Sequence, residues 1–169
     1  LENLPGAKER GAKIWAVLAG AGASCDGQDM VVPNRIGGEA DMRLSLEDAN
    51  ITSDQIDYVN LHGTSTPVGD TVEVEAIKNV FGARVPAFSS TKSMTGHALG
   101  AAGGIESVAT IMALHHGVLP PTINLENPDE GMDLDFVAKE AQERTVNAAI
   151  YNTFGFGGHN AVLVVKRWA

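Results

Sequence analysis

The sequence predicts an α/β fold. Short apolar runs of strand length alternate along the chain with longer amphipathic stretches of helix length. Apolar residues make up 44% of the 169 residues, which is enough for a hydrophobic core. We find no internal repeat and no low-complexity tract. Residues 1–169 are therefore expected to form one domain, or half of a larger one.

In its first part, the chain is divided into elements by apolar runs and the residues that interrupt them. We expect, in chain order, a short linker, a strand over 13–22, a loop over 25–34, a helix over 38–50 and a strand over 56–61. Gly20 and Gly22 break the first strand, and Met42 and Leu46 lie among charged residues at helical spacing. His62 follows the second strand, at the kind of position where open α/β sheets bind ligands.

The second part of the chain continues the alternation. We expect a helix over 71–81, a strand over 87–89, a helix over 99–116 and late strands over 134–137, 148–153 and 161–166. Asp70 is placed to cap the first of these helices, with Glu73 at the capping-box position. The second helix begins beside His97, where its free amides favour negative charge. The last two strands resemble a hairpin with a glycine-rich loop.

Composition and charge exclude several classes of protein. The formal net charge is −9 and the pI is about 4.9, which argues against a nucleic-acid binder. The same acidity means that docking an acidic partner would need a local basic patch. No apolar run is long enough to cross a membrane. A single cysteine favours a reducing compartment, so we expect the cytoplasm or an organelle stroma or matrix.

Three runs of small and polar residues are the most informative parts of the sequence. They read HGTSTPVGD at 62–70, KSMTGHALGAAGG at 92–104 and NTFGFGGHN at 152–160. Each of the first two contains a histidine on an expected loop, where functional residues collect. The residues alone leave open a catalytic pair, two solvated histidines or a zinc pair. No cysteine or third histidine stands at ligand spacing, which disfavours the metal.

In this order, the three runs resemble the C-terminal half of the β-ketoacyl-[acyl carrier protein] synthases, the condensing enzymes of fatty-acid synthesis. LPPTINL at 119–125 and NPDEG at 127–131 also match. The resemblance implies the C-terminal half of a thiolase-like fold, a mixed sheet covered by helices. In this family the acyl-accepting cysteine lies in the preceding half, which we expect as a partner, within a homodimer of the complete protein.

The resemblance also implies catalytic roles. His62 and His97 would donate hydrogen bonds to a thioester oxygen, and Lys92 would order the histidines. Three acidic residues would support the lysine network: Glu106, Asp70 and Glu73. Without the resemblance, Lys92 is an ordinary surface lysine, Glu106 an exposed charge, and the other two acids no more than helix caps.

Four further residues are implied in substrate binding. Thr64 and Thr66 would bind the phosphopantetheine arm of the acyl carrier protein, although turn residues are the simpler interpretation. Phe154 and Phe156 would line the substrate site, with Phe156 as a gate on a mobile glycine-rich loop, rather than serving as core aromatics. No metal or redox cofactor is implied, because phosphopantetheine arrives on the carrier.

The expected reaction is a decarboxylative Claisen condensation of an acyl thioester with malonyl-[acyl carrier protein]. Alternatives are a non-catalytic thiolase-fold subunit or fragment, and a polyketide-type ketosynthase. Cys25 does not align with the nucleophile of the family. Its setting offers no helix N-terminus and no adjacent base, so we expect it to be structural. His115, His116 and His159 receive no role.

Overall fold

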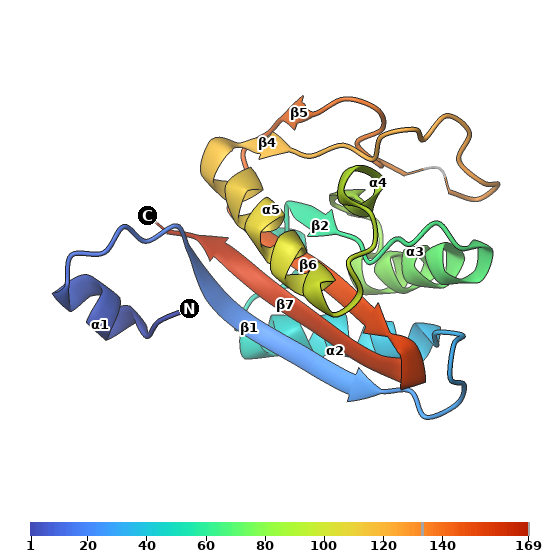
Figure 1. Cartoon of the computed structure of the whole chain (residues 1–169), viewed down its shortest axis with the longest axis horizontal. Coiled ribbons are helices and arrows are strands. Elements are labelled where there is room, and N and C mark those ends of the chain that lie inside the picture. The colour runs from blue at the N-terminus through green and yellow to red at the C-terminus, as the bar shows by residue number, and fades with distance from the viewer. Residues whose placement is uncertain (133, 169) are drawn as a thin grey trace.

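A five-stranded mixed sheet forms the centre of the molecule (Figure 1). The computed structural model describes residues 1–132 and 134–168. In spatial order the strands are β1 (Ala16–Cys25), β7 (His159–Arg167), β6 (Ala148–Gly155), β2 (Tyr58–Asn60) and β3 (Ala87–Ser89). β2 pairs in parallel with β3 and β6, whereas β6, β7 and β1 are antiparallel. The expected α/β class and mixed sheet are confirmed.

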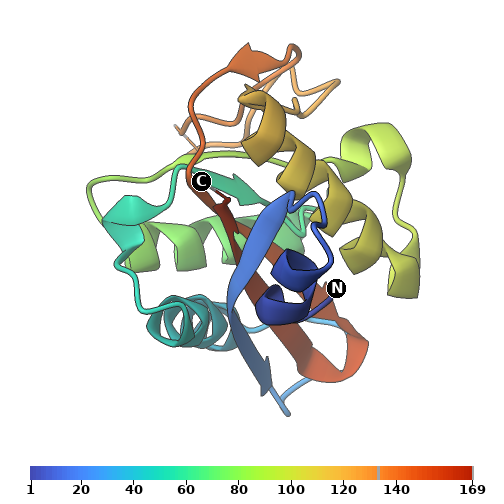
Figure 2. The same ribbon diagram turned by 90° about the vertical axis from the view of Figure 1, so that its left-hand side faces the viewer.

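Helices cover both faces of the sheet (Figures 1 and 2). One face carries α2 (Arg35–Asp48) and α3 (Pro67–Phe81), and the other carries α5 (Ala102–His116). The remaining elements are short. They are α1 (Leu4–Glu9), η1 (Ser53–Gln55), α4 (Lys92–Thr95), η2 (Leu99–Ala101), β4 (Val118–Leu119), β5 (Gln142–Glu143) and η3 (Phe156–Gly158). In the described parts of the chain, every helix is too short or too polar to cross a membrane.

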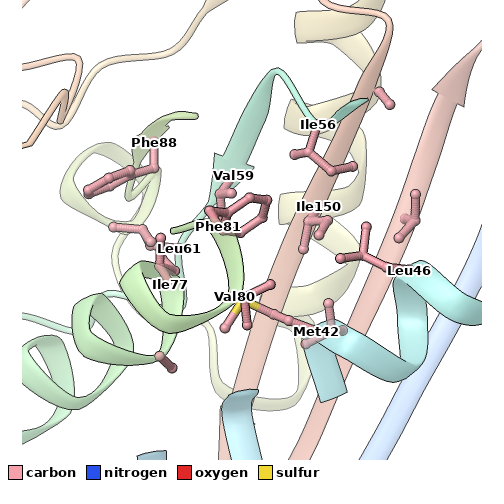
Figure 3. Packing of buried hydrophobic residues seen from close by; sticks show 14 of the residues in the cluster. Met42, Leu46, Ile56, Val59, Leu61, Ile77, Val80, Phe81, Phe88 and Ile150 are labelled. Atoms are coloured by element: carbon pink, nitrogen blue, oxygen red, sulfur yellow. The ribbon is translucent and has the colours of Figure 1, made fainter. Parts of the chain in front are cut away.

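Strand residues alternate between two apolar clusters, one on each face of the sheet. Val59 and Ile150 pack with Met42 of α2 and Ile77 of α3, as Figure 3 shows. The neighbouring strand residues point to the opposite face, where they meet α5. They are Tyr58, Ala149 and Tyr151. The sheet is thus buried on both sides, which holds the ends of its strands in fixed positions.

The glycines of β1 do not break the strand, contrary to our expectation for 13–22. β1 runs on to Cys25, with one register shift between Leu18 and Gly20. A Cβ at Gly20 would lie 2.4 Å from the Ser45 carbonyl oxygen, and one at Gly22 would lie 2.1 Å from that of Asp41. Glycine therefore lets α2 press directly against the strand.

Several predicted boundaries need correction. The predicted linker contains α1, whose first turn is capped by the Asn3 side chain. The predicted strand over 134–137 is absent from the described residues there, and Ala138 instead forms an isolated bridge with Thr122. The hairpin of β6 and β7 is confirmed. Its pairing is longer than predicted, because β6 continues to Gly155 and β7 already begins at His159.

The N-terminus of α3 also differs from the prediction. The helix begins at Pro67 with Thr66 as N-cap, because proline at the first helical position needs no donor. Asp70 is therefore within the first turn, where Oδ1 accepts hydrogen bonds from the backbone N–H groups of Ser65 and Thr66. Asp70 as the N-cap, and Glu73 in a capping box, were both wrong.

Candidate active site

The three runs of small residues converge at one edge of the sheet. β2, β3 and β6 are parallel neighbours, so the segments that follow them start at the same edge. The His62 ring lies 5.6 Å from the His97 ring, centroid to centroid, and the two rings are nearly perpendicular at 87°. The Phe154 ring lies 5.7 Å from that of His62. Residues 62, 97 and 154, far apart in sequence, thus share one site.

The backbone at His62 is held by a buried carboxylate of α3. Glu73 accepts hydrogen bonds from the N–H groups of His62 and Gly63, both at 2.8 Å, and from Asn152 Nδ2 at 2.9 Å. Burial raises the pKa of Glu73 to about 7, although the three donors act in the opposite direction. Glu73 therefore anchors the His62 turn instead of capping its own helix.

His62 is a neutral imidazole at physiological pH. Burial lowers its pKa to about 3, and the electrostatic effects of the nearby Lys92 and His97 act in the same direction. Its Nδ1 atom is buried and has no hydrogen-bond partner among the described residues. A neutral ring carries one N–H, so His62 can donate a single hydrogen bond to a substrate oxygen.

His97 is exposed and is oriented by the backbone. Its Nδ1 atom accepts the N–H of Leu99 at 3.3 Å, which puts the proton of the neutral ring on Nε2. Leu99 adopts φ +51°, a left-handed conformation that costs free energy in a residue with a side chain. The strained turn thus leaves Nε2–H free to donate.

Lys92 and Glu106 form a buried ion pair between α4 and α5. Their side chains are only 5% and 2% exposed. Thr153 Oγ1 of β6 donates to the second Glu106 oxygen at 3.4 Å. The alternatives of a surface lysine and an exposed glutamate are wrong, because each group is buried with the other. The pair fixes the start of the segment that leads to His97.

A pocket of about 460 Å³ opens beside His97. Five of the predicted site residues line it, namely Thr64, Asp70, Glu73, Lys92 and His97. Residues 122–125, 127–129, 132 and 136 also line it, with Asn124 and Asp129 among the polar groups. The other five predicted residues are outside the lining. They are His62, Thr66, Glu106, Phe154 and Phe156.

Thr64 and Thr66 approach each other at the entrance turn of α3, where their hydroxyl oxygens are 3.3 Å apart. Asp70 stabilises this turn from within the helix, and burial raises the pKa of its carboxyl. Among the described residues Asp70 forms no hydrogen bond or ion pair with Lys92, so it acts on the threonine turn.

The two phenylalanines of the third run have different environments. Phe154 packs against the core cluster of α2 and α3 as well as His62, so its expected exclusion from the core was wrong. Phe156 is 70% exposed on η3, the turn between β6 and β7. Cys25 lies beside this turn, with its thiol 3.4 Å from the Gly157 carbonyl oxygen.

Sequence reasoning missed three residues that hold the site. Asn152 binds Glu73, the Ser90 hydroxyl donates to the Gly63 carbonyl at 2.6 Å, and Leu99 orients His97. Asn152 was visible as a polar residue in an apolar strand, but its partner was not. In the described residues, no cluster of three or more His, Cys, Asp or Glu side chains could hold a metal ion.

Solved structures share this fold over nearly the whole chain. The ishigamide ketosynthase/chain length factor superposes with a TM-score of 0.97 at 39% identity, covering 99% of this chain and 42% of that one. A β-ketoacyl synthase from Burkholderia phymatum STM815 gives 0.95 at 39% identity, covering 99% and 41%. The fold and the paired histidines therefore define a thiolase-like ketosynthase domain.

Sequence comparison identifies the family. Residues 15–126 match the family described as "Beta-ketoacyl synthase, C-terminal domain", and the chain belongs to it. It is 50% identical to 3-oxoacyl-[acyl-carrier-protein] synthase 2 of Coxiella burnetii over 171 residues, covering 99% of this chain and 41% of that protein. The same enzyme of Vibrio harveyi is 48% identical, with coverage of 100% and 42%. The chain thus spans about two fifths of the length of these relatives.

Proposed function

We propose that this chain is the C-terminal part of a 3-oxoacyl-[acyl carrier protein] synthase of fatty-acid elongation. The observation that carries the proposal is the pair of perpendicular imidazoles, 5.6 Å apart, at the edge of the sheet. His62 is neutral because it is buried, and His97 has its Nε2–H free because Leu99 occupies Nδ1. Two such donors suit an oxygen on which negative charge develops.

In the proposed reaction, malonyl-[acyl carrier protein] loses carbon dioxide and becomes an enolate whose charge gathers on the thioester oxygen. His62 and His97 each donate one N–H to that oxygen. The carbon of the enolate then attacks the acyl group carried by a cysteine in the preceding half of the enzyme. A carbon–carbon bond forms, the cysteine leaves as thiolate, and a 3-oxoacyl thioester results.

The remaining site residues would position these groups. The Lys92–Glu106 pair places the His97 segment, and Glu73 places the His62 turn. Thr64 and Thr66 would bind the phosphopantetheine arm at the entrance turn of α3. The proposal requires no metal or redox cofactor, since the arm arrives covalently attached to the carrier.

Three partners belong to the proposal. A related type II polyketide ketosynthase has been solved in complex with its acyl-carrier protein, which supports a carrier here. Ile105 and Val108 are 38% and 60% exposed on the outer face of α5, beside a shallow apolar hollow. We assign that face to the N-terminal half of the enzyme, within a cytoplasmic homodimer.

The histidine pair is tested in the enzyme that carries this chain. His62→Ala and His97→Ala should each slow malonyl decarboxylation about 10²–10³-fold, because removing one oxyanion donor has that effect. Acyl loading of the nucleophile should persist. His115→Ala, an exposed histidine at the far end of α5, is the control. Unchanged decarboxylation in both variants would falsify the role of the pair.

Phe156 is proposed as a gate because its ring is exposed and the next two residues are glycines with φ +78° and +75°. Phe156→Ala should raise the ratio of carbon dioxide released to 3-oxoacyl product formed. Phe81→Leu, in the core on α3, is the control for a general loss of aromatic packing. If Phe156→Ala leaves this ratio unchanged, Phe156 is an exposed side chain with no role as a gate.

A polyketide-type ketosynthase is the second candidate, favoured by the superposition on the ishigamide protein. The two candidates differ in their products when no reductase is present. An elongating synthase stops after one condensation, whereas a polyketide ketosynthase adds several malonyl units to one acyl chain. Mass spectrometry of carrier-bound products separates them. A stable, inactive complete protein would favour the non-catalytic alternative.

A further inference from the structure

A buried carboxylate on α2 binds the strand β1 close to the turn that carries Phe156. Asp41 is 0% exposed, and its Oδ2 atom accepts a hydrogen bond from the Ser24 hydroxyl at 3.0 Å. Ser24 is near the end of β1, where it pairs in register with Asn160 of β7. Asn160 is the second residue after η3. Through Ser24, Asp41 is therefore connected to the paired ends of β1 and β7, which flank the turn.

A second set of contacts leads from Asn160 back to α2. Asn160 Nδ2 donates to Asp26 Oδ1 at 2.7 Å, and the N–H of Asn34 donates to Asp26 Oδ2 at 2.9 Å. Asn34 is the N-cap of α2, where its side chain accepts the N–H of Ile36. The polar contacts thus start and end on the same helix, with the two strand ends between them.

The turn itself rests on this framework. The N–H of Asp26 donates to the Gly158 carbonyl at 2.9 Å, and the N–H of Gly157 donates to the Met30 carbonyl at 2.8 Å. A Cβ at Gly158 would lie 2.7 Å from the Cβ of Asp26, so the two segments are in close contact. A shift of the β1 end therefore moves the base of the turn.

Burying the Asp41 carboxyl is unfavourable for the free energy of folding. Its Oδ1 atom is buried with no hydrogen-bond partner among the described residues. Burial also raises the pKa of the carboxyl, with the nearby Asp26 charge acting in the same direction. An apolar side chain would avoid the cost of an unpaired buried oxygen. Among the described residues, the benefit of the carboxyl therefore has to come from Ser24, whose hydroxyl and backbone N–H both favour the ionised form.

We propose that Asp41 is a positioning residue that acts through Ser24 to fix the strand ends on which the Phe156 turn rests. The positioning itself is independent of the reaction. Its consequence, a Phe156 ring held in one resting place, rests on the proposed function. No group of the catalytic site is required for the contact, because Asp41 of α2 binds Ser24 of β1 directly.

Amide hydrogen exchange of Asp26 and Gly157, measured in the enzyme that carries this chain, tests the proposal. Asp41→Ala and Ser24→Ala should each speed exchange at both amides about tenfold, the effect of losing one hydrogen bond to a charged group. Asp41→Asn keeps an oxygen acceptor for Ser24, so exchange should stay near wild type. The double variant should not exceed Asp41→Ala, because Asp41→Ala already removes every contact between the carboxyl and Ser24.

Thr110→Val is the matched control. Thr110 is also fully buried, with an oxygen that has no hydrogen-bond partner in the described part of the chain, but it lies on α5 across the sheet. If Asp41 matters only as a buried polar group, both variants change exchange at Asp26 and Gly157 alike. That result would overturn the proposal. So would exchange in Asp41→Asn as fast as in Asp41→Ala, or exchange at the wild-type rate in both Asp41→Ala and Ser24→Ala.

The same variants separate this proposal from the gate. In the enzyme that carries this chain, Asp41→Ala should raise the ratio of carbon dioxide to 3-oxoacyl product, as Phe156→Ala does. Faster exchange without a change in that ratio supports the positioning by Asp41 and contradicts the gate at Phe156. Loss of the proposed reaction altogether leaves the exchange result standing on its own.

Discussion

The two histidine segments reach the same edge of the sheet by different physical means. The His62 turn is held by Glu73, a buried carboxylate that binds N–H groups and has no cation as a hydrogen-bonded partner among the described residues. The His97 segment is held by Glu106, a buried carboxylate in an ion pair with Lys92. One histidine is neutral because it is buried, and the other is exposed and oriented by a strained backbone.

The comparison shows that two chemically alike donors can depend on different parts of the fold. Substitutions that remove a charge partner should affect the His97 segment most. Changes of pH near neutrality should affect the His62 turn most, because the pKa of Glu73 lies there. The five expectations below test this contrast, from the largest effect to the smallest.

Lys92→Met should have the largest effect. It leaves the Glu106 charge buried without its partner, which typically costs about 3–5 kcal/mol of unfolding free energy. Urea unfolding measures the loss. The double variant Lys92→Met/Glu106→Gln should recover most of it, because no buried charge remains. A loss below about 1 kcal/mol in the single variant would show that water reaches the pair.

The pH dependence of stability should come next. The folded-state pKa of Glu73 is raised from 4.5 to about 7, so the protonated carboxyl stabilises the fold at low pH. That contribution is complete below pH 4.5 and is lost as the pH rises through 7, a fall of about 3 kcal/mol. Glu73→Gln should abolish the fall. Parallel pH profiles for the two proteins would contradict it.

His62 should produce the opposite slope on the acid side. Its folded-state pKa is lowered from 6.5 to about 3, so its contribution is present above pH 6.5 and is lost as the pH falls toward 3. Between pH 4.5 and 6.5 the two groups oppose each other. The unfolding free energy of His62→Asn should therefore fall less than that of wild type on acidification.

Gly63→Ala should cost about 1–3 kcal/mol, because Gly63 has φ +33° and a Cβ there would lie 2.8 Å from the Ser90 Cβ. Thermal unfolding at a fixed pH measures the cost. Gly100→Ala is the control in the other segment, since a Cβ at Gly100 meets nothing within 4 Å. Equal effects of the two substitutions would remove the contrast between the turns.

Leu99→Asn should have the smallest effect and the opposite sign. Asparagine tolerates the left-handed conformation that Leu99 holds at φ +51°, so the variant should gain about 1 kcal/mol. The N–H bond to His97 is kept. Leu99→Ala retains the strain and should gain nothing by urea unfolding. Equal stabilities of the Asn and Ala variants would show that Leu99 is unstrained.

Regular elements were predictable where the apolar pattern is strong. The β6–β7 hairpin, β3 and the body of each long helix follow from periodicity within a few residues. The strand expected at 134–137 failed, because a short apolar run can equally be a packed loop, and Phe136 packs beside Phe88 in this way. Gly20 and Gly22 were read as breakers because a strand pattern does not show that a helix lies against it.

The candidate site was predictable as a set of residues but not as an arrangement. Motifs and resemblance pointed to His62, His97 and Lys92, which do gather. The anchoring by Glu73 was not predicted. Its donors are the backbone N–H groups of His62 and Gly63, about three helical turns upstream, and the side chain of Asn152 on a distant strand, and the sequence pattern shows none of these contacts. Leu99 orients His97 through its backbone N–H alone. Every residue except proline has that group, so the identity of the side chain could not predict the role.

The parallel pairing of β2 with β6 has a consequence for the order of folding. Asp57, just before β2, binds the N–H of Asn147, just before β6, across 90 positions of sequence. Closing so long a loop costs entropy before any contact repays it, and such pairings slow folding. Four residues of the site come earlier in the sequence and so emerge from synthesis well before the strand that bears Asn152 and Thr153. They are His62, Glu73, Lys92 and Glu106. The site is completed only when the last hairpin joins the sheet.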